Sequence, residues 1–136
     1  MVTSSLLEAE KRLLGLISQS KKLYKMSSAH IKAEEFATDV YRRLAKSMYD
    51  SYENGMSPDP AMMLNDFSGD DLSEASEVFY NLEVYSGDEE TVKELLYTIK
   101  LEKLNMRINA ETDPTNLMDL FKQREELLNE KNTWEE

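Results

Sequence analysis

The chain contains no cysteine, and its 136 residues include one histidine, His30, with only three prolines and four glycines. The absence of cysteine excludes disulfides, thiol catalysis and cysteine-based zinc sites, and it fits a cytoplasmic protein. A single histidine excludes the H-E-x-x-H helix and the paired-histidine di-metal bundle. No apolar run approaches the roughly 18 residues of a membrane span, and the first residues lack a signal-peptide pattern. We therefore expect a cytoplasmic protein with no membrane partner.

The sequence also lacks the common catalytic motifs. No serine lies in a Gly-x-Ser-x-Gly pattern, and the four glycines stand apart from one another, so no glycine-rich loop is available to hold a phosphate. The adjacent carboxylates Asp70-Asp71 and Glu89-Glu90 fall at expected helix starts, where the helix dipole already accounts for them. We therefore expect no catalytic residue, no metal site and no cofactor. A small acidic helical enzyme is the alternative that this inventory disfavours.

The formal charge of -11 argues against duplex DNA or an anionic membrane surface as the main partner, because phosphate contacts need clustered lysine and arginine. We expect no direct binding to nucleic acid. The stretch from 47 to 92 contains no lysine or arginine. Its twelve acidic residues are Asp50, Glu53, Asp59, Asp66, Asp70, Asp71, Glu74, Glu77, Glu83, Asp88, Glu89 and Glu90. Two interpretations stay open: a docking surface for a basic partner, and a solvated surface that keeps the protein in solution.

Hydrophobic spacing predicts an all-α fold, because apolar residues recur at helical intervals and no segment alternates as a strand would. Ser4 or Ser5, Thr38 and Asp59 are expected helix caps, and Asn54-Gly55 is an expected left-handed helix stop. The expected helices cover about 5–18, 20–26, 39–53, 60–67, 69–82, 89–111 and 115–132. We expect a bundle of about six helices followed by a C-terminal antiparallel helical hairpin.

The predicted helix 89–111 joins these two parts. Its apolar face rotates along its length, so its first half suits packing against the preceding chain and its second half suits packing against the C-terminal residues. The first set is Val92, Leu95, Leu96 and Ile99, and the second is Tyr97, Leu101, Leu104 and Ile108. Asp113-Pro114 ends this helix. We expect a bundle subdomain over 1–100 and a hairpin subdomain over 101–136.

The hairpin is the predicted binding surface, because two helices make a small core and leave much apolar edge. Its second helix is expected to turn inward Leu117, Leu120, Phe121, Arg124, Leu127 and Leu128. The candidate contacts to a partner protein are Met106, Leu117, Met118, Phe121 and Leu128, some of which would instead hold the hairpin together. Met106 and Met118 are expected to face outward, and the other methionines to fill the core. Trp134 is expected to fold back on the hairpin. We expect a monomer that can exchange hairpins with a second copy.

Two segments resemble the C-terminal helicase-binding domain of bacterial DNA primases of the DnaG type. They read EAEKRLLGLI over 8–17 and FATDVYRRLAKSMYDSYENGMSPDP over 36–60. The matching positions are Ala9, Glu10, Lys11 or Arg12, Leu13, Leu14, Phe36, Arg42, Leu44, Tyr52, Glu53, Gly55, Asp59 and Pro60. The resemblance extends over about 6–132. Tyr41 departs from it, since members often carry histidine there, and the hairpin is shorter and less basic than theirs.

This resemblance implies a non-catalytic fragment of a primase, the nucleotidyltransferase that makes primers in the primosome during DNA replication. The hairpin would dock on the N-terminal collar of the hexameric replicative helicase, and the bundle, similar in fold to that helicase's N-terminal domain, would modulate helicase activity. One alternative is the N-terminal domain of a replicative helicase itself, against which the terminal hairpin argues. Another is an acidic helical regulator that masks a basic partner.

Overall fold

The structure is a computed structural model that describes residues 2–80 and 87–134. Over those residues it is helical and contains no strand, and the predicted all-α bundle with a C-terminal hairpin is confirmed. Its elements are α1 (Ser4–Gln19), α2 (Lys21–Ser28), the 3₁₀ turn η1 (Ala33–Glu35), α3 (Asp39–Glu53), α4 (Pro60–Leu64), α5 (Gly69–Tyr80), α6 (Glu89–Ala110) and α7 (Pro114–Lys131). None of the helices described is long and apolar enough to cross a membrane.

The helix boundaries follow local capping chemistry. Thr38 and Asp59 cap α3 and α4 as predicted, and Gly55 takes the expected left-handed conformation with φ +74°. The predicted cap of α1 is wrong, because Thr3 rather than Ser4 or Ser5 accepts the hydrogen bond, from the backbone N–H of Leu6. The helix predicted over 60–67 is also shorter than expected, since α4 ends at Leu64 and the chain continues in two tight turns.

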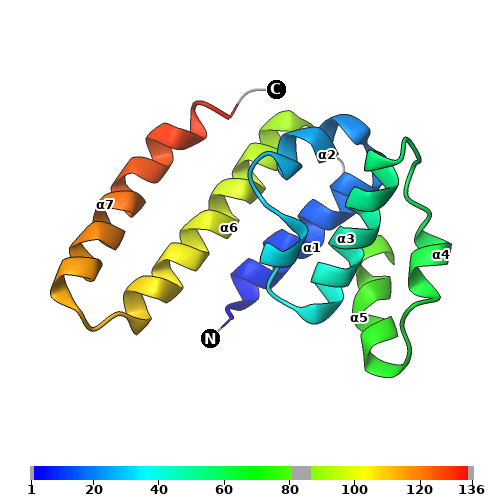
Figure 1. Ribbon diagram of the computed structural model, residues 1–136, viewed down its shortest axis with the longest axis horizontal. Helices are drawn as coiled ribbons and strands as arrows, with labels where there is room; N and C mark the ends of the chain where they lie inside the picture. The colour runs from blue at the N-terminus through cyan, green and yellow to red at the C-terminus, as the bar shows by residue number, and fades with distance from the viewer. Residues whose placement is uncertain (1, 81–86, 135–136) are drawn as a thin grey trace.

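Helix α1 lies at the centre of the bundle. It packs against α2, α3, α5 and α6, and Figure 1 shows these helices around it. Leu13, Leu14 and Ile17 are fully buried although they do not share one narrow face. An apolar face this wide is what a helix covered on several sides requires.

The long helix α6 belongs to both parts of the molecule. In its first half Val92, Leu96 and Ile99 are almost fully buried, and the helix packs against α1 and α2. Further along, Leu104 is buried and α6 packs against α7. The rotation of the apolar face thus corresponds to a change of packing partner. The division into subdomains over 1–100 and 101–136 stays a prediction.

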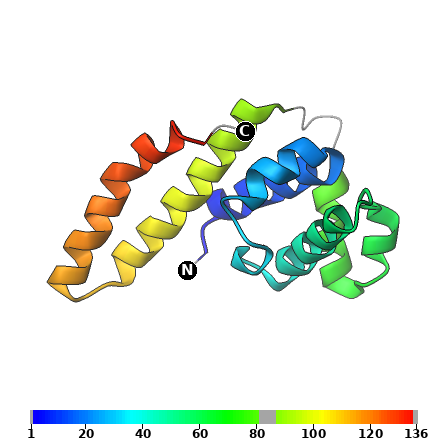
Figure 2. The same ribbon diagram turned by 45° about the horizontal axis from the view of Figure 1, so that its top comes forward.

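The hairpin extends away from the bundle. Figures 1 and 2 show α7 running alongside α6, at the opposite end of the molecule from α4. Leu127 is the buried residue of α7, and Arg124 Nη1 donates a hydrogen bond of 2.9 Å to Asn105 Oδ1 across the hairpin. Lys131 forms an ion pair with Glu94. The hairpin is therefore held by a narrow apolar seam with polar contacts beside it.

Trp134, just beyond α7, folds back, but against the loop between α2 and η1 as well as α6 rather than on the hairpin alone as predicted. Its side chain is only 5% exposed, and its ring centroid lies 5.1 Å from that of His30. Lys100 of α6 places its ammonium 5.7 Å from the centroid of the same ring. The end of the hairpin is therefore attached to the loop between α2 and η1.

Candidate functional site

One flank of α7 carries three exposed apolar side chains, which we call the apolar stripe. Met118 is 71% exposed, Leu128 54% and Phe121 38%. With about 100° of rotation per residue, the three lie within about 80° of one another, and the middle of that arc lies roughly 140° from the buried Leu127. Arg124 places its guanidinium 5.3 Å from the centre of the Phe121 ring. The stripe faces solvent, and the charged side chains of Arg124 and Glu125 lie between Phe121 and Leu128 along the helix.

The five residues predicted to contact a partner do not all lie on this stripe. Met106 is half-buried against the core, so its predicted outward orientation is wrong. Leu117 is half-buried, and with about 100° of rotation per residue it lies about 20° from Leu128 on the same helix. Phe121 and Leu128, predicted to face inward, are instead exposed, because α6 is the main helix packed against α7 and covers only part of its surface.

Several other residues expected in the core are exposed for a similar reason. Met56 and Met62, taken as core filler, are 62% and 68% exposed. Met56 follows the turn at Gly55, and Met62 lies in a helix of five residues that has little surface to bury. In the predicted helix 69–82, the helical spacing of Leu72, Phe79 and Leu82 predicts that all three face the core. Leu72 is instead 37% exposed and Phe79 is half-buried. Leu82 lies outside the described residues.

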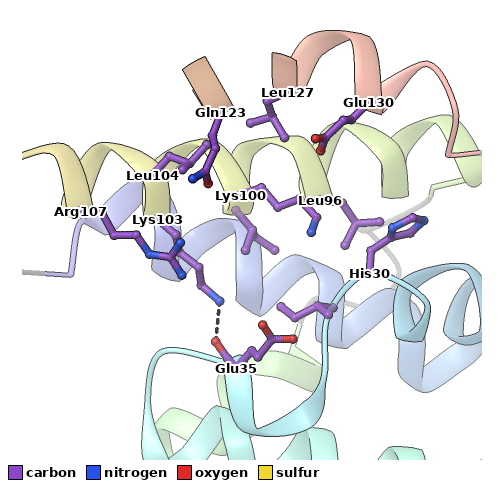
Figure 3. A pocket seen from close by; sticks show the side chains of 12 residues that line it. His30, Glu35, Leu96, Lys100, Lys103, Leu104, Arg107, Gln123, Leu127 and Glu130 are labelled. Atoms are coloured by element: carbon purple, nitrogen blue, oxygen red, sulfur yellow. Dashed lines mark hydrogen bonds between the residues drawn. The ribbon is translucent and has the colours of Figure 1, made fainter. Parts of the chain in front are cut away.

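A pocket of about 200 Å³ lies on the opposite flank of α7, between α7, α6 and the segment from α2 to η1. Its apolar lining comes from Ile31, Leu96, Ile99, Leu104 and Leu127. Its polar lining is His30, Glu35, Lys100, Lys103, Arg107, Gln123 and Glu130, and Figure 3 shows the labelled members around the space. The pocket therefore combines an apolar wall with three cations from one helix.

The cations of this pocket are unequally neutralised. Lys103 donates a hydrogen bond to the backbone carbonyl of Glu35 and lies 3.9 Å from Glu10 Oε2. Burial lowers the pKa of Lys103, the charges of Glu10 and Glu35 oppose that fall, and the charges of Lys100 and Arg107 add to it. Within 2–80 and 87–134, no carboxylate forms an ion pair with Lys100 or Arg107. Positive charge is thus concentrated locally in a strongly acidic protein.

His30 lines the same pocket. Burial lowers its pKa below the ordinary value, and the charge of Lys100 lowers it further. Sequence reasoning did not find this pocket. The available signal was the spacing of Lys100, Lys103 and Arg107, which places all three on one side of a helix.

Glu10 is a buried carboxyl at the junction of α1 with α6. Its side chain is completely buried, and Oε1 accepts a hydrogen bond of 2.8 Å from the backbone N–H of Ala37, whereas Oε2 accepts none. Burial raises the pKa of Glu10, and the Ala37 hydrogen bond and the charges of Lys103 and Arg42 oppose that rise. One of the residues that carried the family resemblance therefore has a position inside the core. The residues described contain no cluster of acidic or histidine side chains that could hold a metal.

The family comparison covers the bundle and the first part of the hairpin helix α6. The model of the DnaB-like helicase N-terminal domain matches residues 2–101, which run from before α1 into α6. The chain belongs to the DnaB-like helicase N-terminal domain family. No curated protein and no solved structure matches it. Membership places this DnaB-like domain in DNA replication and agrees with a domain that is not itself catalytic.

The predicted membership in the primase family is wrong, since the family match is to the helicase domain. The predictions of a primase parent, of a place in the primosome and of docking on a helicase collar are therefore wrong as well. The resemblance rested on the spacing of apolar and capping residues, and no motif in it was chemically specific. Such spacing is typical of a helical bundle, so two families with similar bundles have similar spacing.

The alternative that the DnaB-like match supports is the N-terminal domain of a replicative helicase. In the sequence, the terminal hairpin argued against this alternative. However, the match ends at residue 101, so α7 lies outside it and does not count against membership.

Proposed function

We propose that this chain is the non-catalytic N-terminal domain of a DnaB-type replicative helicase, and that it acts in the cytoplasm as a protein-interaction module. The observation that carries the proposal is the family match across α1 to α5 and the first half of α6. The stripe lies on α7, and the pocket lies between α6, α7 and the α2–η1 segment, so the bundle positions both.

The proposed contact is between the apolar stripe and the same stripe of a second copy. Exposed clusters of large apolar side chains commonly mark protein interfaces. A two-fold arrangement with antiparallel α7 helices places Met118 of one copy opposite Leu128 of the other. The two-fold symmetry repeats this pairing at the other end of the stripe. Apolar side chains therefore meet apolar side chains at both ends, which favours a second copy as the occupant.

In this arrangement Met106 does not contact the second copy, because it is half-buried against the core. Leu117 is also half-buried and offers less apolar area than the three exposed side chains. Direct partner contacts are therefore assigned to Met118, Phe121 and Leu128. The isolated chain is a monomer when dilute and associates as its concentration rises.

Changing Met118 and Leu128 together to glutamine should abolish this association. Both side chains are more than half exposed in the monomer, so their replacement removes apolar contact area without opening a cavity. Sedimentation equilibrium should show a rising average mass for the unchanged chain and monomer mass for the double variant. The melting temperature at low concentration should shift by only about 2 °C, because exposed substitutions usually cost less than about 0.5 kcal/mol.

Met62→Gln is the matched control, since Met62 is 68% exposed but lies on α4, far from α7. It should associate like the unchanged chain. The contact is refuted if the unchanged chain stays monomeric at all concentrations, or if the double variant associates normally. A dimer that separates only slowly on dilution points to hairpin exchange and equally excludes contact through the stripe.

A further inference from the structure

We propose that the pocket between α6, α7 and the α2–η1 segment binds a diphosphate group, either free or carried by a nucleotide. The pocket lies on the flank of α7 opposite the apolar stripe, so a ligand there leaves the stripe accessible. This binding site goes beyond the proposed helicase-domain function and does not depend on it.

The three cations set the size of the anion. Lys100, Lys103 and Arg107 occupy successive turns on one side of α6, and about 10 Å of helix separates the first from the last. A single small anion cannot reach all three without drawing the side chains together. Two linked phosphoryl groups span more of that distance and offer oxygens to both ends of the row.

Unmatched charge favours an anion at both ends of this row. Lys100 and Arg107 form no ion pair within the described residues, whereas Lys103 is held by the Glu35 carbonyl and by Glu10. Figure 3 shows Arg107 beside Lys103 and the ammonium of Lys100 in the pocket. Arginine and lysine form the short, charge-assisted hydrogen bonds that phosphates accept. Lys100, whose ammonium already lies near the Trp134 ring, and Arg107 are therefore the residues that gain an anionic partner when the ligand binds.

The opposite wall contributes both an attraction and a repulsion. Gln123 of α7 presents an amide that can donate to a phosphate oxygen, and Glu130 of the same helix presents a carboxylate that repels it. Glu35 also lines the space, but its Oε1 accepts a hydrogen bond of 2.7 Å from the backbone N–H of Lys32. Removing the charge of Glu130 should therefore strengthen binding, whereas removing that of Arg107 should weaken it.

Calorimetric titration of the full chain with inorganic pyrophosphate tests this proposal. Arg107→Gln should weaken pyrophosphate binding about tenfold, as expected for loss of a charge-assisted contact, and Glu130→Gln should strengthen it by about threefold. Arg107 is exposed, so its variant should keep the melting temperature of the unchanged chain. Lys122→Gln, an equal loss of charge on the same hairpin outside the pocket, should bind pyrophosphate normally.

Parallel titrations with ADP and with adenosine distinguish the sources of the diphosphate. Equal binding of pyrophosphate and ADP indicates that the diphosphate alone is recognised, and tighter binding of ADP indicates that the nucleoside also contacts the protein. Either result supports the site if the Arg107 variant weakens it. The proposal is overturned if millimolar pyrophosphate and ADP fail to bind, if adenosine binds as well as ADP, or if Lys122→Gln weakens binding as much as Arg107→Gln.

Discussion

Replacing Leu96 with alanine should lower the free energy of unfolding by about 3 kcal/mol, within the 2 to 5 kcal/mol usual for such changes in a core. Leu96 is completely buried where α6 packs against α1 and α2. Truncation therefore removes apolar contacts and leaves a cavity at the point where the hairpin helix joins the bundle. Urea denaturation followed by circular dichroism measures the loss.

Leu128→Ala is the matched control for this change. It makes the same substitution in the same hairpin, but Leu128 is 54% exposed, so the cost should stay below about 0.5 kcal/mol. The comparison should be made at a protein concentration at which the unchanged chain is monomeric. Equal losses in the two variants, or a Leu96 variant as stable as the unchanged chain, contradict the placement of α6 in the core.

The second large effect concerns pH. In the unfolded chain Glu10 has the ordinary glutamate pKa of about 4.3, and burial raises that pKa in the folded state. Below the ordinary pKa the carboxyl is protonated in both states. Above it the unfolded state releases the proton first, so the stability contributed by protonated Glu10 is lost as pH rises toward the folded-state pKa. The loss approaches about 1.4 kcal/mol per pH unit within that window.

Glu10→Gln should remove this dependence, because glutamine keeps an oxygen that can accept from Ala37 and cannot ionise. Subtracting the stability of the variant from that of the unchanged chain, across a pH series, isolates Glu10 from the other carboxylates. The difference should decrease as pH rises above about 4.3. Glu8→Gln is the control, since Glu8 is exposed and pairs with Lys11 on the surface, and it should give no such decrease. A difference that is flat or rises with pH for Glu10 contradicts the raised pKa.

The fold was largely predictable because its signals are local. Spacing of apolar residues located the helices, and Thr38, Asp59 and Gly55 marked caps and stops that depend on neighbouring backbone groups. Leu72 and Met62 were expected in the core but are exposed, so residue spacing alone did not predict their burial. Spacing identifies residues that share a face, but only the packing of other helices decides whether that face is covered.

The candidate site was harder to predict for the same reason. The outward position of Met118 was predictable, because Met118 lies away from the row of apolar residues expected to face α6. The exposure of Phe121 and Leu128 was not, because it depends on how little of α7 is covered by α6. The pocket unites His30, Arg107 and Gln123, which lie far apart in the chain. The family prediction failed because capping and apolar spacing are shared by bundles of similar shape.

The continuity of α6 has a mechanical consequence. Because Glu89–Ala110 is one unbroken helix, no flexible joint separates the part held by α1 from the part that carries α7. A force applied to α7 is therefore carried along α6 to its contact with α1. If α7 moves relative to the bundle, α6 has to tilt against α1, so the displacement is felt in the core.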